Sequence, residues 1–201
     1  GRREYNIKFK DLNTGQTYEN TLSNSSGDMA WSSDGRYLFY VLRDKETLLP
    51  FKLFRHEIGS SQSEDVLVYE EKDPTFYLSV GNSRSMEFIE INISSTTSSE
   101  VRLINSDTPE QSPYIFLKRE SDHLYSIEHD PEDNRFLVET NWLAKNFRLM
   151  AIDLKKSADK NEWIELIPHR EDTLLQSALA FPNHLVIMER ENGLRQLKII
   201  T

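Results

Sequence analysis

Hydrophobic and polar residues alternate with a period of two over most of the chain, which is the spacing of a β-strand with one buried face. The first run, Tyr5–Lys10, is followed by a turn signal at Asn13–Gly15 and by a second short run, Gln16–Glu19. The best helical candidate, Lys155–Lys160, is too short and polar to form an important element. Further strand-length runs are expected at Tyr37–Leu42, Phe51–Ile58, Val66–Tyr69, Phe76–Val80, Met86–Ile93, Val101–Ile104, Tyr114–Lys118, Phe136–Thr140, Phe147–Leu154, Trp163–Ile167, Leu185–Met188 and Leu194–Ile200. The pattern predicts an all-β chain.

Polar triplets recur at nearly constant spacing, and each precedes one of these runs. They are Asp34-Gly35-Arg36, Asn82-Ser83-Arg84, Asp133-Asn134-Arg135 and Pro182-Asn183-His184. Their third residues lie 48, 51 and 49 positions apart. A period of about 50 residues, with three or four short strands in each unit, is typical of the radially repeated sheets of a β-propeller. Each triplet is expected to form the turn between the two innermost strands of a blade.

We therefore predict a single partial β-propeller of about four blades, each a four-stranded antiparallel sheet. Residues 1–27 are expected to supply the outer strands of one blade, and residues 175–201 the inner strands of another. Residues 28–74, 75–121 and 122–174 are expected to form three complete blades. Because propellers remove exposed strand edges by closing the ring, the chain is expected to be cut from a larger one. A natural four-bladed ring, closed by pairing of the first and last strands, stays open as an alternative.

The amino-acid composition excludes several classes of binding partner and of site. With 33 acidic and 24 basic residues the net charge is −9, so the long-range field repels phosphate backbones and anionic lipids. We expect no nucleic acid partner and no membrane, and the chain has no apolar run of about 18 residues that could span one. The absence of cysteine excludes disulfides and thiolate sites, and it favours a cytoplasmic location.

No segment carries recognisable catalytic chemistry. Gly81-Asn82-Ser83 comes nearest to a nucleophile elbow, but it lacks the second glycine and the following helix. The acidic clusters Glu70–Asp73 and Asp130–Asp133 are expected in solvated turns. Surface or blade-edge positions are expected for the five histidines, His56, His123, His129, His169 and His184, rather than metal ligation, although His123 and His129 flank one strand. We predict no catalytic residue, no cofactor and no metal in this chain.

Several segments resemble the propeller of the oligopeptidase B (protease II) group in the prolyl oligopeptidase family. The segments are Arg3–Leu12, Thr47–Phe51, Arg55-His56, Gln62–Glu71, Thr97–Leu103 and Glu165–Glu171. The stretch Ser63–Glu71, which reads Ser-Glu-Asp-Val-Leu-Val-Tyr-Glu-Glu, is hard to obtain from a generic blade.

The resemblance implies a seven-bladed ring over an α/β-hydrolase domain, with a Ser, Asp and His triad that cuts short peptides after Lys or Arg. That hydrolase domain lies outside these 201 residues, so this chain alone is expected to be inactive. Its implied role is size exclusion, because a ring over an active site admits only thin chains. The implied partners are the peptidase domain of the same parent chain and short basic peptides.

One substrate contact is implied by the same resemblance. Arg3, the second residue of the Arg2-Arg3 pair, lies where the family's propeller approaches the substrate, and it could bind a peptide carboxylate. The alternative is that Arg2 and Arg3 only keep an edge strand soluble.

Two other functions stay open. Most propellers without a cofactor motif bind proteins through their faces, so a freestanding interaction scaffold is one alternative. A sugar-binding or hydrolytic propeller with paired channel carboxylates is another. In any of these cases, open blade edges are expected to cause self-association.

Overall fold

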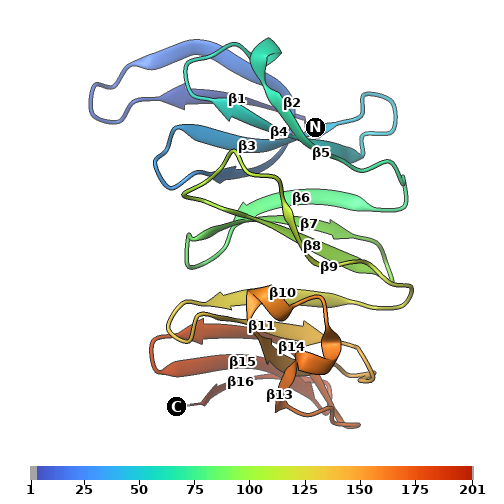
Figure 1. Ribbon diagram of the computed structural model, residues 1–201. Coiled ribbons are helices and arrows are strands. Elements are labelled where there is room, and N and C mark those ends of the chain that lie inside the picture. Colours follow the sequence, from blue (N-terminus) through green and yellow to red (C-terminus); the bar gives the residue numbers. More distant parts are fainter. Residues whose placement is uncertain (1–3, 201) are drawn as a thin grey trace. The chain divides into compact units, whose positions relative to one another are not determined.

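The computed structural model describes residues 4–200 and confirms the all-β prediction (Figure 1). In these residues the strands form four sheets that follow one another along the chain. Their orders are β1-β2-β3-β4-β5, β6-β7-β8-β9, β10-β11-β12-β13 and β14-β15-β16. Sheets built from sequentially adjacent strands are the arrangement expected of propeller blades.

The described residues contain sixteen strands and three short 3-10 helices. The strands are β1 Tyr5–Lys10, β2 Thr17–Trp31, β3 Tyr37–Arg43, β4 Pro50–Glu57, β5 Val66–Glu70, β6 Tyr77–Asn82, β7 Phe88–Ser94, β8 Ser99–Asn105, β9 Tyr114–Leu117, β10 Tyr125–Asp130, β11 Arg135–Thr140, β12 Arg148–Ile152, β13 Ile164–Ile167, β14 Thr173–Phe181, β15 His184–Glu191 and β16 Leu194–Ile200. The helices are η1 Gln62–Glu64, η2 Leu154–Lys156 and η3 Lys160–Glu162. Asp153 and Asp159 cap η2 and η3 by accepting hydrogen bonds from backbone N–H groups, in the region where the sequence suggested a short helix.

The four polar triplets form the turns that the sequence predicted. They connect β2 to β3, β6 to β7, β10 to β11 and β14 to β15, which are the first two strands of each repeat. All four strand pairs are antiparallel. Asn134 and Asn183 adopt positive φ angles of 48° and 61°, which asparagine tolerates better than most residues.

Three strand segments were not predicted from the sequence: the later part of β2, all of β10 and all of β14. In β14 the register shifts between Leu175 and Ser177, and in β2 it shifts between Ser25 and Met29. A shift in register breaks the alternation on which strand prediction depends. β10 reads Tyr-Ser-Ile-Glu-His-Asp, where buried His129 and Asp130 look like surface residues in the sequence.

β2 changes its pairing partner along its length. It pairs with β1 from Thr17 to Ser25 and with β3 from Ser25 to Trp31. Gly27, with a φ of 99°, lies at the change, where a Cβ atom would come within 3.0 Å of the Tyr5 ring. The expected boundary between residues 27 and 28 falls inside this strand, and the one between 174 and 175 falls inside β14. The blade boundaries remain predictions.

The chain divides into two compact units. The first comprises Gly1–Asn82, Met86–Ser95 and Arg102–Tyr114, and the second comprises Ser83–Ser85, Thr96–Val101 and Ile115–Thr201. Among residues 4–200, no helix has the length and hydrophobicity that crossing a bilayer requires.

The core of the first unit depends on a central strand that is covered on both faces. In β3, Phe39 and Val41 join one hydrophobic cluster, whereas Leu38 and Tyr40 join another. The first cluster includes alternate residues of β7, Ile89, Ile91 and Ile93, as the period of two predicts. The second includes residues of β1 and β2. Each fully buried aliphatic or aromatic side chain contributes about 1.5–3 kcal/mol to folding.

The core of the second unit joins the β10–β13 and β14–β16 sheets. Leu137, Leu149 and Ala151 pack with Leu175 and Ile187. Leu137 and Ala151 are direct cross-strand partners, so these side chains occupy one face of their sheet. This packing positions the pocket described next.

Candidate functional site

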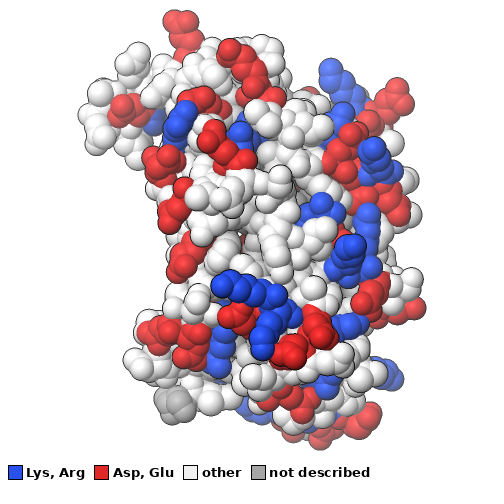
Figure 2. Space-filling view, in the orientation of Figure 1, with Lys and Arg blue, Asp and Glu red and all other residues white. Residues whose placement is uncertain are grey.

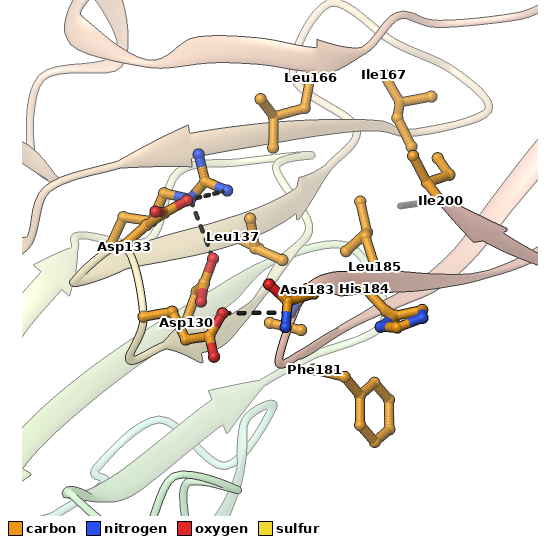
Figure 3. Close-up of a pocket in the computed structure, with 13 residues that line it drawn as sticks. Asp130, Asp133, Leu137, Leu166, Ile167, Phe181, Asn183, His184, Leu185 and Ile200 are labelled. Atoms are coloured by element: carbon orange, nitrogen blue, oxygen red, sulfur yellow. Dashed lines mark hydrogen bonds and ion pairs between the residues drawn. The ribbon is translucent and has the colours of Figure 1, made fainter.

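A pocket of about 650 Å³ lies beside the β10–β11 and β14–β15 turns in the second unit (Figure 3). Its lining comes from all the strands of these two sheets except β12 and from the turns. Aliphatic side chains form one side of it, namely Leu137, Leu166, Ile167, Leu185 and Ile200. We call it the turn pocket. No single stretch of sequence marks this pocket, because its walls come from strands that are far apart in the chain.

The opposite side of the turn pocket is acidic. Asp130, Glu132 and Asp133 line it together with one guanidinium, that of Arg135. Arg135 Nε lies 3.2 Å from Asp130 Oδ2, and Arg135 Nη2 lies 2.7 Å from Asp133 Oδ2. The Asn183 backbone N–H donates to Glu132 Oε2 over 3.2 Å. Three carboxylates against one guanidinium leave the pocket with a negative potential.

These contacts correct the expectation that both acidic clusters are solvated. Asp130 is only 8% exposed. In the other cluster, Glu71 is 6% exposed, and its carboxylate accepts hydrogen bonds of 2.8 Å from the Tyr69 hydroxyl and the Asp73 backbone N–H. A turn that carries several acids can bury one of them when nearby donors satisfy its oxygens.

A pocket with an aliphatic side and an acidic side suits a ligand that is both apolar and cationic. On the face shown in Figure 2, acidic and basic side chains are interspersed. Exposed ion pairs such as that of Arg36 with Glu57 neutralise opposite charges within the surface. The turn pocket differs because its acids outnumber its single base.

The nearest match to a nucleophile elbow is a structural turn. Asn82 is the last residue of β6, and its side chain donates to the Trp31 carbonyl and accepts from the Trp31 N–H, each over 2.8 Å. Ser83 is 3% exposed, and its hydroxyl lies 2.9 Å from that of Ser85. The next element is strand β7 rather than a helix. The geometry that activates a catalytic serine is therefore absent at this turn.

The sequence predicted surface or blade-edge positions for the five histidines, but three of them are buried. His56, His123 and His129 are buried, with exposed fractions of 0%, 5% and 2%. His123 Nε2 lies 2.8 Å from Thr140 Oγ1, and burial lowers the pKa of its imidazole. His129 Nδ1 lies 2.9 Å from Ser85 Oγ. Buried histidines with local partners are part of the folded core. Within residues 4–200 no group of three or more potential ligands could hold a metal ion.

His56 belongs to a buried polar cluster in the first unit. Its Nδ1 lies 2.7 Å from Asp65 Oδ1, and the two side chains are 0% and 1% exposed. The Tyr40 hydroxyl donates to Asp65 Oδ2 over 2.7 Å, and Gln62 Nε2 donates to the Tyr40 oxygen over 3.1 Å. Burial and the bond to Asp65 raise the Tyr40 pKa. The Phe9 ring stacks on His56 at 5.4 Å. We call these four polar residues the His56 cluster.

The one substrate contact predicted from sequence, Arg3, lies outside the described residues. Its role remains a prediction.

Comparisons with known proteins agree with the fold. Residues 1–201 match the family model described as "Prolyl oligopeptidase, N-terminal beta-propeller domain". The chain is 39% identical over its whole length to dipeptidyl aminopeptidase BI of Pseudoxanthomonas mexicana and 36% identical to Protease 2 of Moraxella lacunata. The solved structure of oligopeptidase B from Leishmania major superposes on the whole chain with a TM-score of 0.92 at 29% identity.

These relatives are much longer than the chain. It spans 27% of the dipeptidyl aminopeptidase, 28% of Protease 2 and 28% of the Leishmania protein. The predicted partial propeller and the predicted resemblance are both confirmed. The chain belongs to the prolyl oligopeptidase family, within its N-terminal β-propeller domain.

Proposed function

We propose that this chain is the non-catalytic gating portion of a serine oligopeptidase that cleaves short peptides after Lys or Arg. The observation that carries the proposal is the match of all 201 residues to the propeller domain of a peptidase family. The propeller filters substrates by size, because a channel through packed blades excludes folded proteins from the active site. The hydrolase domain of the same parent chain is its partner, and the parent acts in the cytoplasm.

The preference for basic peptides rests on charge. The chain has a net charge of −9, and the turn pocket offers three carboxylates beside aliphatic walls. Such a field draws cationic peptides toward the propeller and raises their rate of association. Arg3 contributes by binding a peptide carboxylate, as its position in the family's pattern suggests.

The proposal is tested with the full-length parent protein and with the 201-residue chain in parallel. We expect the full-length protein to hydrolyse short arginine and lysine amides and to cleave peptides of about ten residues. It should leave intact a folded protein that contains the same cleavage sequence. The chain alone should give no turnover. Cleavage of a stably folded substrate at a rate similar to that of the peptide would contradict size exclusion, and activity of the purified chain alone would contradict a non-catalytic role.

Release of dipeptides from the amino end is a second candidate activity for the parent, and the relative named dipeptidyl aminopeptidase BI favours it. A peptide with an internal arginine and a blocked amino terminus separates the two activities. An enzyme that cuts after internal basic residues cleaves it, whereas one that requires a free amino end leaves it whole.

Self-association of the isolated chain follows from its last sheet. β16 is at the edge of the order β14-β15-β16, and Leu194, Leu197 and Ile199 are 67–70% exposed. An exposed apolar edge strand pairs readily with another chain. Light scattering should show concentration-dependent dimers that the substitution Leu197→Lys reduces, and a monomer at all concentrations would contradict this expectation.

A further inference from the structure

A second cavity, of about 140 Å³, lies between the β10–β13 sheet and β14 and shares the wall residue Leu137 with the turn pocket. Its lining comprises Ser126, Ile127, Glu128, Leu137, Glu139, Leu149, Ser177, Ala178 and Leu179. All of these residues belong to the second unit. We call this space the Glu139 cavity.

Strand register places a carboxylate on the packing face of the sheet. Glu139 in β11 is directly opposite Ser126 in β10 and Leu149 in β12, so the three side chains share one face. On that face Leu137 and Leu149 pack against residues of the next sheet, including Leu175 and Ile187. Glu139 is therefore a charged residue at a position that otherwise builds the core.

The chain gives this carboxylate no partner. Among residues 4–200 no ion pair or hydrogen bond of the Glu139 side chain is present, and burial is the one cause that raises its pKa, to about 7. The other acid in the cavity, Glu128, is satisfied, because Arg84 Nε lies 2.8 Å from its Oε1. Arg84 is also held over the Phe181 ring at 4.1 Å, so it is committed to that position.

A cation would stabilise an ionised carboxylate in this half-buried place, because partial burial of an unpaired charge is costly. The cavity is larger than a single water, whose share of liquid volume is about 30 Å³. Ser126 and Leu179 are exposed, so the cavity has an entrance. The hydroxyls of Ser126 and Ser177 add hydrogen-bond acceptors near the carboxylate, and Leu137 and Leu149 supply apolar walls.

We propose that the Glu139 cavity binds an organic cation with a guanidinium or primary ammonium headgroup. Glu139 supplies the counter-charge, the two serine hydroxyls accept further N–H bonds, and the leucines contact the methylene next to the headgroup. The headgroup is either that of a free amine or guanidine or that of a basic side chain of a peptide. The proposal does not depend on peptidase activity.

Binding must depend on pH, because the cation requires ionised Glu139. Around the carboxylate, β10 contributes Glu128, which is paired with Arg84, and β12 contributes Leu149. The β14 segment that lines the cavity, residues 177–179, has no titratable side chain. Glu139 is therefore the group whose titration controls occupancy. With half-ionisation near pH 7, the apparent affinity at pH 6 should be about tenfold weaker than at pH 8.

The test is isothermal titration of the 201-residue chain with methylguanidinium and with ethylammonium at pH 8 and pH 6. We expect saturable binding at pH 8, about tenfold weaker binding at pH 6, and a heat near pH 7 that depends on the buffer because a proton is released. Methylurea, which has a similar shape without the charge, should not bind.

Variants separate this site from general surface charge. Glu139→Gln should abolish binding, and Ser177→Ala should weaken it a few-fold through loss of one hydrogen bond. Glu46→Gln, at an exposed glutamate between β3 and β4, is the matched control and should leave binding unchanged. Flat titrations of the wild-type chain at pH 8, or equal affinity in Glu139→Gln that retains its circular dichroism spectrum, would overturn the proposal.

A further pair of ligands identifies the source of the headgroup. Acetyl-arginine-amide is compared with methylguanidinium, and acetyl-citrulline-amide is the uncharged control. If the arginine amide binds at least tenfold more tightly than methylguanidinium and Glu139→Gln removes both, the site recognises a peptide side chain. Equal affinities assign it to free cations.

Discussion

Two acids, one with a buried side chain and one half-buried, differ in how the chain accommodates their charge. Asp65, in the first unit, has both carboxylate oxygens satisfied, by His56 and by Tyr40, each at 2.7 Å. Glu139, in the second unit, lies on a packing face and has burial as the cause of its raised pKa. The chain supplies hydrogen-bond partners to both oxygens of Asp65, whereas the Glu139 carboxylate is available to solvent, a proton or a ligand.

The difference distinguishes a polar group that stabilises the fold from one that is free to bind a ligand. A buried carboxylate with all partners supplied by the chain rigidifies its surroundings and has no remaining capacity to bind. A carboxylate without partners reduces stability when ionised, and such a cost is a feature of binding sites more often than of cores. The following predictions test whether the two acids differ in this way.

The largest effect is expected from Asp65→Ala. The substitution removes the partner of His56 Nδ1 and of the Tyr40 hydroxyl, both of which stay buried. Loss of one member of a buried pair costs about 3–5 kcal/mol, so urea denaturation should show a decrease of that size in the free energy of unfolding.

The matched control is Asp107→Ala, at an exposed aspartate in the loop between β8 and β9, which should change the free energy of unfolding by less than about 0.5 kcal/mol. Equal effects of the two substitutions would show that the His56 cluster does not stabilise the fold.

The opposite sign is expected from Glu139→Gln. The native carboxyl ionises at about 7 and its ordinary pKa is 4.5, so the folded state holds the proton more tightly than the unfolded state. Relative to the ionised form, the protonated carboxyl stabilises the fold; this stabilisation is fully present below pH 4.5 and is lost as the pH rises through 7. The variant should match the wild type at pH 4.5 and exceed its stability at pH 8 by about 2 kcal/mol, after allowance for partial exposure.

Urea denaturation at several pH values, in buffers free of organic cations, checks this expectation. A difference between variant and wild type that stays constant from pH 4.5 to pH 8 would contradict it. Because the measurement involves no ligand, it remains informative even if the Glu139 cavity binds no cation.

The sequence predicted most of the fold because blade strands keep their alternation and blade turns keep their polar triplets. Ile89, Ile91 and Ile93 are buried as alternation requires, and the four triplets turn where expected. The missed segments depend on tertiary structure. The register shift in β14 and the change of partner within β2 displace residues from the expected face, which no local pattern records.

The polar sites were much less predictable. The segments Arg55-His56 and Gln62–Glu71 supply His56, Gln62 and Asp65 of one buried cluster, but their strand pattern and family resemblance did not predict that these polar side chains meet. Glu139 looks like an ordinary surface glutamate in Phe-Leu-Val-Glu-Thr. One signal could have found it: it alternates with Leu137, and the same face of the strand holds both residues.

A smaller effect is expected from Tyr40→Phe, which removes the 2.7 Å bond to Asp65 and the 3.1 Å bond from Gln62. Neither partner is left unpaired, because Gln62 Nε2 also donates to the Ser23 carbonyl. Asp65 keeps His56 Nδ1 at 2.7 Å, and the phenyl ring keeps its contact with Phe54 at 6.1 Å. The net value of one hydrogen bond is about 0.5–1.5 kcal/mol, so loss of the Asp65 bond should lower the free energy of unfolding by that amount, and loss of the longer Gln62 bond should add to it. A loss as large as that of Asp65→Ala would mean that the cluster acts as one cooperative unit.

The smallest effect is expected from Glu57→Gln, which breaks the ion pair between Arg36 and Glu57. Its 3.0 Å separation is close to the 2.7 Å of the His56–Asp65 pair, but its side chains are 58% and 49% exposed. Water and salt screen such a pair, and both long side chains lose freedom in making it. The urea midpoint should match the wild type within error at 0.15 M salt, and a small decrease should appear only at low salt. A salt-independent loss comparable to that of Tyr40→Phe would show that distance, rather than burial, determines the strength of these pairs, and the contrast between Asp65 and Glu139 would then need another cause.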